Sequence, residues 1–286
     1  MIFMSRKKET GSILPIAASA AAATAALGAL LVYAIKPGSY TEEMALPMKK
    51  RYFAHRGLHS PDKSVPENSL AAFKLACEGN YGIELDVQLS YDGQVVVFHD
   101  ETLQRVCHRE GKLADFTLED LKEMKLCETN ESIPLFSEVL ELVNGRVPLL
   151  VELKPTSRRE ELCQKTLSLL EEYSAKTGGL FCVESFDPFI LRWFKLHAPH
   201  ILRGQLSMPM DEFDKKYNPL LRFAMSKCFM NCHGRPHFIS YMISGNPIAT
   251  RITKRMGALQ AIWTSRTKGE GPDKDMVIFE FYRPEL

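Results

Sequence analysis

This 286-residue chain lacks a large net charge of either sign. Its 36 Lys and Arg residues nearly balance its 35 Asp and Glu residues, which gives a formal net charge of +1. A protein that binds nucleic acid needs a clustered basic surface to displace counterions from the phosphates. The balance therefore argues against a nucleic-acid partner. The content of 45% hydrophobic and 25% charged residues is typical of a globular protein and excludes a disordered, collagen-like or coiled-coil chain.

Cysteine pairs of the kind that bind metals are also absent. The seven cysteines include no C-x-x-C pair, and because their number is odd they cannot all be joined in disulfides. A tetrahedral zinc site and a complete disulfide framework are therefore poor interpretations of this spacing. We expect buried free thiols in a reducing compartment.

A long run without charge occurs at the N-terminus, within residues 10–35. As a helix, residues 13–35 would be about 34 Å long, enough to cross a hydrocarbon core of about 30 Å. We expect residues 1–36 to form a tail and a single transmembrane helix at about 13–35, followed by a linker over 37–50. Basic residues lie on both sides of the run, so the charge pattern leaves the membrane orientation undecided.

Two other interpretations of this N-terminal run stay open. Ten of its residues are alanine, so the helix is only mildly apolar and could be buried or lie on a surface. Small residues around positions 18–22 resemble the cleavage site of a signal peptide, although the apolar run continues well beyond them. We favour an uncleaved, single-pass anchor that places the protein at a lipid bilayer.

From residue 51 to residue 286, short apolar runs alternate with amphipathic stretches. The expected strands are 51–55, 82–89, 94–99, 148–154, 180–186, 201–207, 237–243, 259–264 and 276–282. Helix-like segments separate most of them, and repeated strand–helix units indicate an α/β fold with a parallel sheet. Eight such units can close into a (β/α)8 TIM barrel, so one of the nine strands must be additional.

The additional strand is identified by a short connection. Only Ser90 to Gln94 separate strand 82–89 from the next run, too few residues for a parallel crossover, and Asp92-Gly93 is a strong hairpin signal. If Asp92 and Gly93 are the two loop residues, Asp86 faces His99 across the ladder. A slip of one residue would turn His99 to the other face. Residues 101–147 then form a small insertion after the second strand.

Acidic residues interrupt the apolar strands where the mouth of such a barrel would be. Glu84, Asp86 and Glu152 would cost several kcal/mol each to bury unless they are paired or bind a metal. Three carboxylates suit one hard divalent cation, Ca²⁺ or Mg²⁺. Lys154 could instead form a simple ion pair with Glu152. We expect a metal site at the carboxyl ends of the strands.

Two histidines and an arginine accompany these carboxylates at the strand ends. Free imidazole titrates near neutrality, so His55 and His99 are candidates for acid–base catalysis, and Arg56 can bind a phosphate through two hydrogen bonds. Beside the carboxylates, the two histidines are therefore candidate proton carriers and Arg56 is a candidate phosphate ligand.

Six segments in this order resemble the signature of bacterial-type glycerophosphodiester phosphodiesterases. They are His55-Arg56-Gly57, Pro66-Glu67-Asn68-Ser69, Glu84-Leu85-Asp86-Val87, Asp92-Gly93, Val97-Phe98-His99-Asp100 and Val151-Glu152-Leu153-Lys154. The resemblance covers about residues 51–284 and becomes looser after Lys154. It differs at His237, where related sequences often carry Asp, and at the C-terminus, where no residues remain for an eighth helix.

The resemblance implies a fold, an activity and roles for these residues. It implies a TIM barrel that hydrolyses glycerophosphodiesters to glycerol 3-phosphate and an alcohol with one divalent metal, through a cyclic phosphate. The implied metal ligands are Glu84, Asp86 and Glu152, and the implied acid–base pair is His55 and His99. Arg56 and Lys154 would bind the substrate phosphate, and Glu67 and Asn68 would support the site.

Two alternative functions remain beside this one. The expected membrane anchor also suits a lysophospholipase D that acts on lysophospholipids. From a different class, the chain could be a catalytically inactive, membrane-anchored binding or scaffold protein. An inactive barrel would have no need of both histidines and all three carboxylates, and this sequence has them all.

Overall fold

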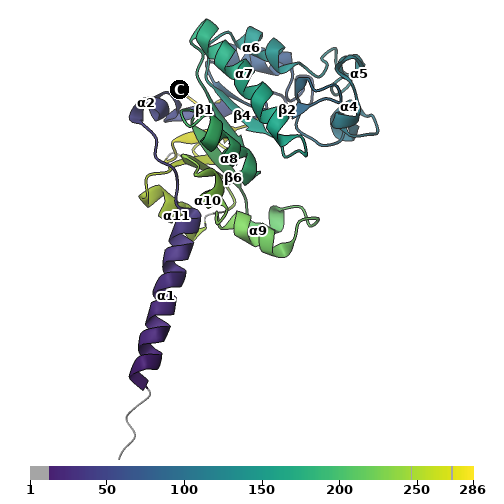
Figure 1. Ribbon diagram of the computed structural model, residues 1–286. Coiled ribbons are helices and arrows are strands. Elements are labelled where there is room, and N and C mark those ends of the chain that lie inside the picture. Colours follow the sequence, from purple (N-terminus) through teal and green to yellow (C-terminus); the bar gives the residue numbers. More distant parts are fainter. Residues whose placement is uncertain (1–12, 246, 272) are drawn as a thin grey trace, which may run out of the picture.

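The computed structural model describes residues 13–286 apart from 246 and 272. The predicted N-terminal tail, residues 1–12, lies outside the described residues, as do the side chains of residues 13–18, 20 and 47. The ribbon in Figure 1 shows a rounded domain from which one long helix projects.

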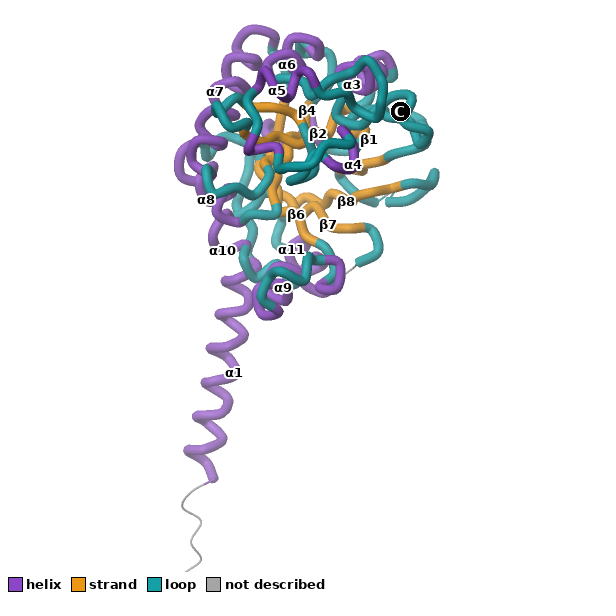
Figure 2. Tube along the Cα trace, turned by 90° about the vertical axis from the view of Figure 1, so that its right-hand side faces the viewer, coloured by secondary structure: helices purple, strands orange, loops and turns teal. Residues whose placement is uncertain are grey.

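Eight parallel strands form a closed barrel, as the strand–helix alternation predicts. The barrel strands are β1 (Arg51–Ala54), β2 (Gly82–Leu89), β4 (Leu149–Leu153), β5 (Phe181–Ser185), β6 (Arg203–Ser207), β7 (Phe238–Met242), β8 (Leu259–Ser265) and β9 (Met276–Phe279). Each strand pairs with its neighbour in this order, and β1 pairs with both β2 and β9, which closes the sheet. Figure 2 shows the strands at the centre with helices around them.

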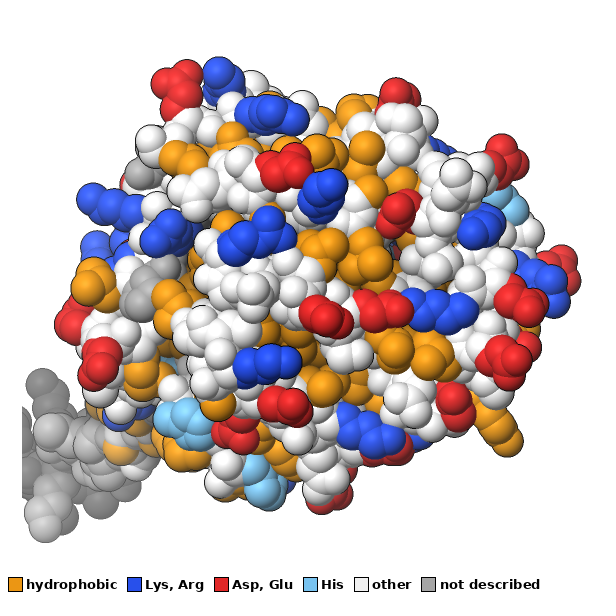
Figure 3. Space-filling model, turned by 90° about the horizontal axis from the view of Figure 1, so that it is seen from above, with side chains coloured by type: hydrophobic (Ala, Val, Ile, Leu, Met, Phe, Trp, Pro, Cys, Tyr) orange, Lys and Arg blue, Asp and Glu red, His pale blue; other side chains and the backbone are white. Residues whose placement is uncertain are grey.

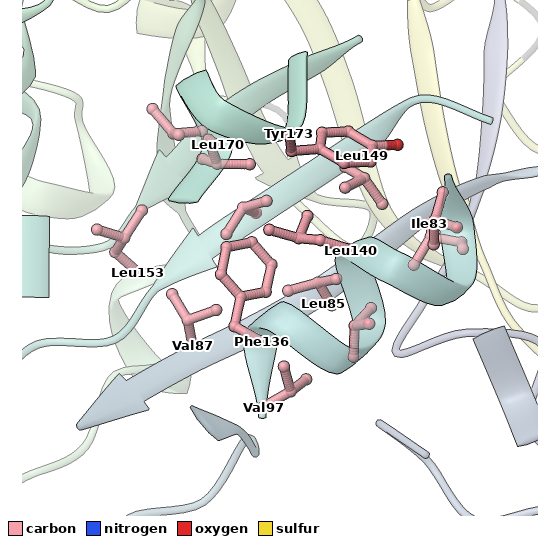
Figure 4. Packing of buried hydrophobic residues seen from close by; sticks show 14 of the residues in the cluster. Ile83, Leu85, Val87, Val97, Phe136, Leu140, Leu149, Leu153, Leu170 and Tyr173 are labelled. Atoms are coloured by element: carbon pink, nitrogen blue, oxygen red, sulfur yellow. The ribbon is translucent and has the colours of Figure 1, made fainter. Parts of the chain in front are cut away.

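Helices cover most of the outer face of the barrel. They are α3 (Leu70–Glu78), α6 (Phe136–Val143), α7 (Arg159–Thr177), α8 (Pro188–His197), α10 (Asn231–Gly234) and α11 (Ile248–Arg255). Strands β2 and β4 alternate between the two faces of the sheet. Ile83, Leu85 and Val87 point outward and pack against Phe136 and Leu140 of α6 (Figure 4). Because side chains alternate along a strand, Glu84 and Asp86 face the barrel interior.

The hairpin after β2 differs from its predicted register by one residue. The additional antiparallel strand, β3 (Val95–Val97), pairs Val87 with Val97 and Leu89 with Val95. The loop therefore has three residues, with Gly93 at φ +78° in the left-handed region, and the predicted two-residue loop is wrong. His99 does not face Asp86 in the ladder. It follows the end of β3, where the chain has left the ladder and is free to turn back toward the barrel.

The insertion that follows β3 has a small core of its own. It contains α4 (Gln104–Cys107), η2 (Leu113–Asp115) and α5 (Leu118–Glu123). Leu103, Leu113 and Leu121 are buried there with Val96 and Phe98 of the hairpin. Thr117 caps α5 and exchanges hydrogen bonds with Asp120 in a capping box. The insertion is thereby held against the carboxyl end of β2.

No helix follows β8 or β9 among the described residues, so aromatic side chains cover that flank instead. Tyr81, Phe279 and Tyr282 pack together, and Tyr81 Oη donates a hydrogen bond to the carbonyl of Pro284 at 2.9 Å.

Helix α1 (Ile13–Ile35) has the bounds that the sequence predicts and projects away from the barrel (Figure 1). Its C-terminal end is fixed to the α10 region. Arg235 Nη1 donates to the carbonyls of Tyr33 at 2.7 Å and Lys36 at 2.9 Å, and its guanidinium lies 4.3 Å from the centre of the Tyr33 ring. Asn231 Nδ2 donates to the carbonyl of Ile35 at 3.1 Å. A cation at this end satisfies free carbonyls and complements the helix dipole.

Over the residues that the structure describes, no helix combines the length and the hydropathy of a membrane-spanning segment. The predicted helix is thus confirmed, whereas its transmembrane role is not.

Residues 37–50, expected to be a linker, contain α2 (Glu42–Ala45) and η1 (Leu46–Met48). Ala45 and Met48 are buried in the barrel interior with Phe53, Leu150 and other inward-facing side chains. This segment therefore closes the amino-terminal end of the barrel and connects α1 to it through a packed structure.

The surface at the top of Figure 1 carries both signs of charge. Figure 3 shows this face, with Lys and Arg interspersed among Asp and Glu and no extended patch of one sign.

The seven cysteines are free, as predicted, and four of them are buried.

His237 lies just before β7, at the end of the barrel that residues 37–50 close. Its Nδ1 accepts a hydrogen bond from the backbone N–H of Arg203 at 3.3 Å, and its ring contacts Tyr40 edge to face at 6.0 Å. Burial, and secondarily the Arg203 guanidinium, lower the pKa of His237 to about 3. This residue is therefore a neutral part of the core, remote from the barrel mouth.

We expect His237 to lower the free energy of unfolding as the pH falls below about 6.5. An unfolded histidine takes up a proton near pH 6.5 and the folded His237 does so only near pH 3, so protonation favours the unfolded chain between these values. The loss is at most about 1.4 kcal/mol per pH unit. In urea unfolding, the His237→Gln variant should lose less free energy of unfolding than the unmodified protein between about pH 6.5 and 4.5. Equal losses would contradict the buried neutral state.

Candidate active site

Three buried carboxylates meet inside the mouth of the barrel. Glu84 and Asp86 lie two residues apart on the inward face of β2, and Asp86 is in register with Glu152 on the neighbouring strand β4. Each of the three offers an oxygen atom, and these oxygens all lie within 4.8 Å of one another. The sequence analysis predicts this convergence from strand alternation, and the structure brings these residues together.

Two cations hold this acidic cluster in place. Lys154 Nζ lies 2.9 Å from both Asp86 Oδ1 and Glu152 Oε1. Arg56 Nε lies 3.7 Å from Asp86 Oδ2, and Arg56 Nη1 donates to Glu67 Oε1 at 2.7 Å. The side chains of Lys154 and Arg56 are mostly buried, so their positive charges act on the carboxylates with little screening by water.

A tight turn after β1 positions Arg56. Arg56 and Gly57 have positive φ angles of 54° and 78°, and the backbone N–H of Arg56 donates to Glu84 Oε2 at 2.9 Å. A Cβ atom at Gly57 would lie 2.8 Å from Cβ of Ala72 on α3. Glycine is therefore required by both its backbone angle and this close approach, which explains the His55-Arg56-Gly57 motif.

The segment Pro66 to Ser69 serves both α3 and the acidic cluster. Ser69 caps α3 by accepting from the N–H of Ala72 at 3.1 Å. Asn68, at φ +53°, is thereby directed inward, and its Nδ2 donates to Asp86 Oδ2 at 2.8 Å. Glu67 receives hydrogen bonds from Arg56 and from Arg105 of the insertion. The two residues predicted to support the site therefore contact it directly.

Each candidate acid–base histidine has a carboxylate at its Nδ1 atom. His55 Nδ1 lies 2.9 Å from Glu280 Oε2, and His99 Nδ1 lies 2.6 Å from Asp100 Oδ1. Both imidazoles line one cavity of about 510 Å³, together with Glu84 and Glu152. A partner at Nδ1 fixes the ring orientation and leaves Nε2 for the cavity.

Three residues of this site were not assigned a role from the sequence. Glu280 follows β9, far from the other motifs along the chain, and Arg105 lies in the insertion, where it holds Glu67 and Asp100. Glu184 on β5 is buried in register with Glu152. An acidic residue inside an apolar strand is the signal that could have identified Glu184. Glu280 has a similar signal at the end of β9.

The charge balance of the cluster depresses one pKa and raises others. Burial raises the pKa of Glu84, and the nearby Asp86 and Glu152 raise it further. Burial also raises the pKa of Glu184 and of Glu152, although Lys154 opposes the rise at Glu152. Burial opposes ionisation of Asp86 too, but Lys154, His99 and Arg56 hold its pKa well below the usual range. The cluster therefore carries more acidic groups than its two cations neutralise.

This donor set fits a divalent cation. The three carboxylates provide hard oxygen ligands at mutual distances that one ion could bridge, and an ion there would favour ionised Glu84. A second group of His55, His59 and Glu280 also lies close together. There Arg266 Nε already lies 2.6 Å from Glu280 Oε1, and His55 and His59 both pair with the other oxygen of Glu280. The acidic cluster is thus the better candidate.

The arrangement of the site agrees with the comparison by sequence. The profile of the glycerophosphoryl diester phosphodiesterase family matches residues 55–280, which include every residue of the cluster. The chain belongs to this family. A curated glycerophosphodiester phosphodiesterase of Caldanaerobacter subterraneus subsp. tengcongensis is 41% identical over 169 residues, which is 56% of this chain and 67% of that protein. One from Bacillus altitudinis is 38% identical over 168 residues, or 55% and 66% of the two chains.

Solved structures of this family share the barrel. The phosphodiesterase of Oleispira antarctica, solved with its product sn-glycerol-3-phosphate, has a TM-score of 0.66 at 23% identity and covers 82% of this chain and 94% of that chain. The glycerophosphodiester phosphodiesterase of Thermotoga maritima has a TM-score of 0.59 at 26% identity and covers 80% and 93%. These likenesses establish a common (β/α)8 fold.

A divalent cation should stabilise the folded protein through the acidic cluster. A ligand that binds the folded state alone raises its stability with concentration, by about 2.7 kcal/mol at 100 times the dissociation constant. We expect Ca²⁺ or Mg²⁺ to raise the thermal midpoint of the unmodified protein and to raise it much less in Glu84→Gln and Glu152→Gln variants. Glu172→Gln, an exposed change on α7, is the control. Equal shifts in all the variants would place the cation elsewhere.

Proposed function

We propose that this protein is a metal-dependent glycerophosphodiester phosphodiesterase that releases glycerol 3-phosphate and an alcohol. The observation that carries the proposal is one cavity lined by His55, His99, Arg56, Glu84 and Glu152, with Asp86 and Lys154 in contact with these lining residues. Membership of the family supports the same reaction class.

Glu84, Asp86 and Glu152 would hold one Ca²⁺ or Mg²⁺ ion, which when bound supplies positive charge to a phosphoryl oxygen and lowers the pKa of a bound hydroxyl. Arg56 and Lys154 add fixed positive charge beside the same position. Charge that is already oriented toward the developing negative oxygens is usually the largest contribution to catalysis.

His55 and His99 carry the protons in this proposal. One imidazole takes the proton of the glycerol 2-hydroxyl as its oxygen attacks phosphorus, and the other gives a proton to the departing alcohol. Water then opens the cyclic phosphate with the two roles exchanged, so that glycerol 3-phosphate leaves and both imidazoles return to their first state. Glu280 and Asp100 keep the two Nε2 atoms directed into the cavity.

Loss of either imidazole should reduce turnover strongly. General acid–base catalysis contributes about 10² to 10⁴ in rate, so His55→Ala and His99→Ala should each lower kcat for glycerophosphocholine by at least about 10². Release of glycerol 3-phosphate, followed with a coupled dehydrogenase, measures the effect. His197→Ala, at an exposed position on α8, is the control. Near-normal turnover in either active-site variant would contradict the assignment.

The direct test of the proposed function is hydrolysis of glycerophosphocholine with and without a chelator. The protein should release glycerol 3-phosphate, lose the activity in EDTA, and recover it when Ca²⁺ or Mg²⁺ is returned in excess. Activity that survives thorough chelation would contradict the metal requirement. Lack of release under all these conditions would contradict the proposed function.

We also propose that α1 attaches the protein to a lipid bilayer, with the catalytic domain on a side that stays undetermined. The support is the uncharged sequence of residues 13–35 and the exposure of Leu27, Leu30 and Leu31 on the described part of the helix. These apolar side chains are exposed to water, and burial in lipid would remove them from it.

Charge on α1 should abolish this attachment. The full-length protein should float with phosphatidylcholine vesicles in a density gradient, and a Leu27→Lys, Leu31→Lys double variant should remain at the bottom, because buried lysine is costly in a bilayer. Leu196→Lys, on the exposed face of α8, is the matched control and should float normally. Flotation of the double variant would show that α1 is not the attachment.

A further inference from the structure

A second cavity lies beside the catalytic one. It has a volume of about 570 Å³ and shares the wall residues Glu152, Phe186 and Met208 with the catalytic cavity, so the two adjoin at these residues. It runs between the carboxyl ends of β4 to β6 and α9 (Pro219–Ser226). We call it the α9 groove.

The walls of the α9 groove are mainly apolar. Its apolar lining includes Phe186, Phe189, Met208, Phe213, Leu221 and Met225. Among its charged residues, Arg159 and Asp187 pair with each other at 2.7 Å, and Arg159 also lies over the Phe189 ring. The groove therefore has charged residues at the end beside Lys154, and beyond this end its walls are mainly apolar.

A polar glycerophosphodiester with a small alcohol would leave most of this groove empty. Its phosphate belongs beside Lys154 and Arg56, and its hydroxyl groups could find few partners among phenylalanine and methionine side chains. A hydrocarbon chain suits these walls, since burial of each methylene is worth up to about a fourfold gain in affinity. Flexible methionine side chains also adapt to chains of different length.

The position of α9 gives such a chain a route from a lipid surface. Figures 1 and 2 both place α9 at the end of the domain from which α1 projects. On the outer side of α9, Leu220 and Phe223 are exposed to solvent, whereas Leu221 and Met225 line the groove. Lys227 lies over the Phe223 ring, next to this apolar surface.

We propose that the α9 groove binds the acyl chain of a monoacylated glycerophosphodiester, so that lysophospholipids are substrates of this site. The inference rests on the proposed function, because the phosphodiester must lie at the acidic cluster while the chain lies in the groove. The bond between phosphorus and the headgroup oxygen breaks. Water supplies the oxygen that phosphorus gains and the proton that the headgroup alcohol gains, which leaves a monoacylglycerol phosphate.

The test compares two substrates that release the same alcohol. Choline release by the full-length protein is measured with glycerophosphocholine and with 1-octanoyl-lysophosphatidylcholine, at concentrations where the short-chain lipid is monomeric. The acyl chain should raise kcat/KM by at least about 30-fold. Burial of three methylenes at about fourfold each would already exceed this gain. Leu221→Glu, which puts a charge in the groove, should bring the ratio of the two kcat/KM values toward one. Leu221→Ala should lower the same ratio less.

The matched control is Leu220→Glu, which adds the same charge to the outer side of the same helix and should leave the ratio unchanged. Normal release from glycerophosphocholine without a gain for the octanoyl substrate would overturn the inference and leave the proposed function in place. Equal ratios in Leu221→Glu and Leu220→Glu would also overturn it and would mean that something other than an acyl chain occupies the groove. Failure to hydrolyse either substrate would overturn the proposed function itself.

Discussion

Burial of like charges in the barrel mouth is the constraint on which the site depends. Glu84, Asp86 and Glu152 are almost inaccessible to water, and uncompensated charge in such a place costs several kcal/mol. Lys154, Arg56 and Asn68 compensate part of it. The left-handed backbone at Arg56 and at Asn68 directs a donor from each of these residues toward the carboxylates, and Gly57 and the cap at Ser69 support these two turns.

Support for the site extends beyond the motifs that surround it. Glu280 and Asp100 orient the two imidazoles that line the cavity, and Arg105 ties the insertion to both Glu67 and Asp100. At the other end of the barrel, residues 37–50 close the interior and Arg235 fixes the end of α1. The projecting helix is therefore joined to the barrel by a packed connection, and Figure 1 shows α9 on the side of the domain toward which α1 projects.

The sequence predicts the barrel and most of the site because both depend on local patterns. Alternation along β2 turns Glu84 and Asp86 inward, and the parallel order of the strands brings Glu152 beside them. The hairpin register was wrong because Asp92-Gly93 suits loops of two or three residues, and only the structure distinguishes them. Glu280 was missed because its partner, His55, is 225 residues away along the chain. Residues 37–50 look like a linker because Ala45 and Met48 gain their buried contacts only once the barrel has closed.

The most direct test of this account is anomalous diffraction from a crystal of the protein grown with Mn²⁺, which replaces Mg²⁺ or Ca²⁺ at oxygen sites and scatters anomalously. We expect one strong peak at bonding distance, about 2.0–2.6 Å, from carboxylate oxygens of Glu84, Asp86 and Glu152. A peak at His55, His59 and Glu280 instead, or an acidic cluster that binds no ion at a saturating concentration, would contradict it.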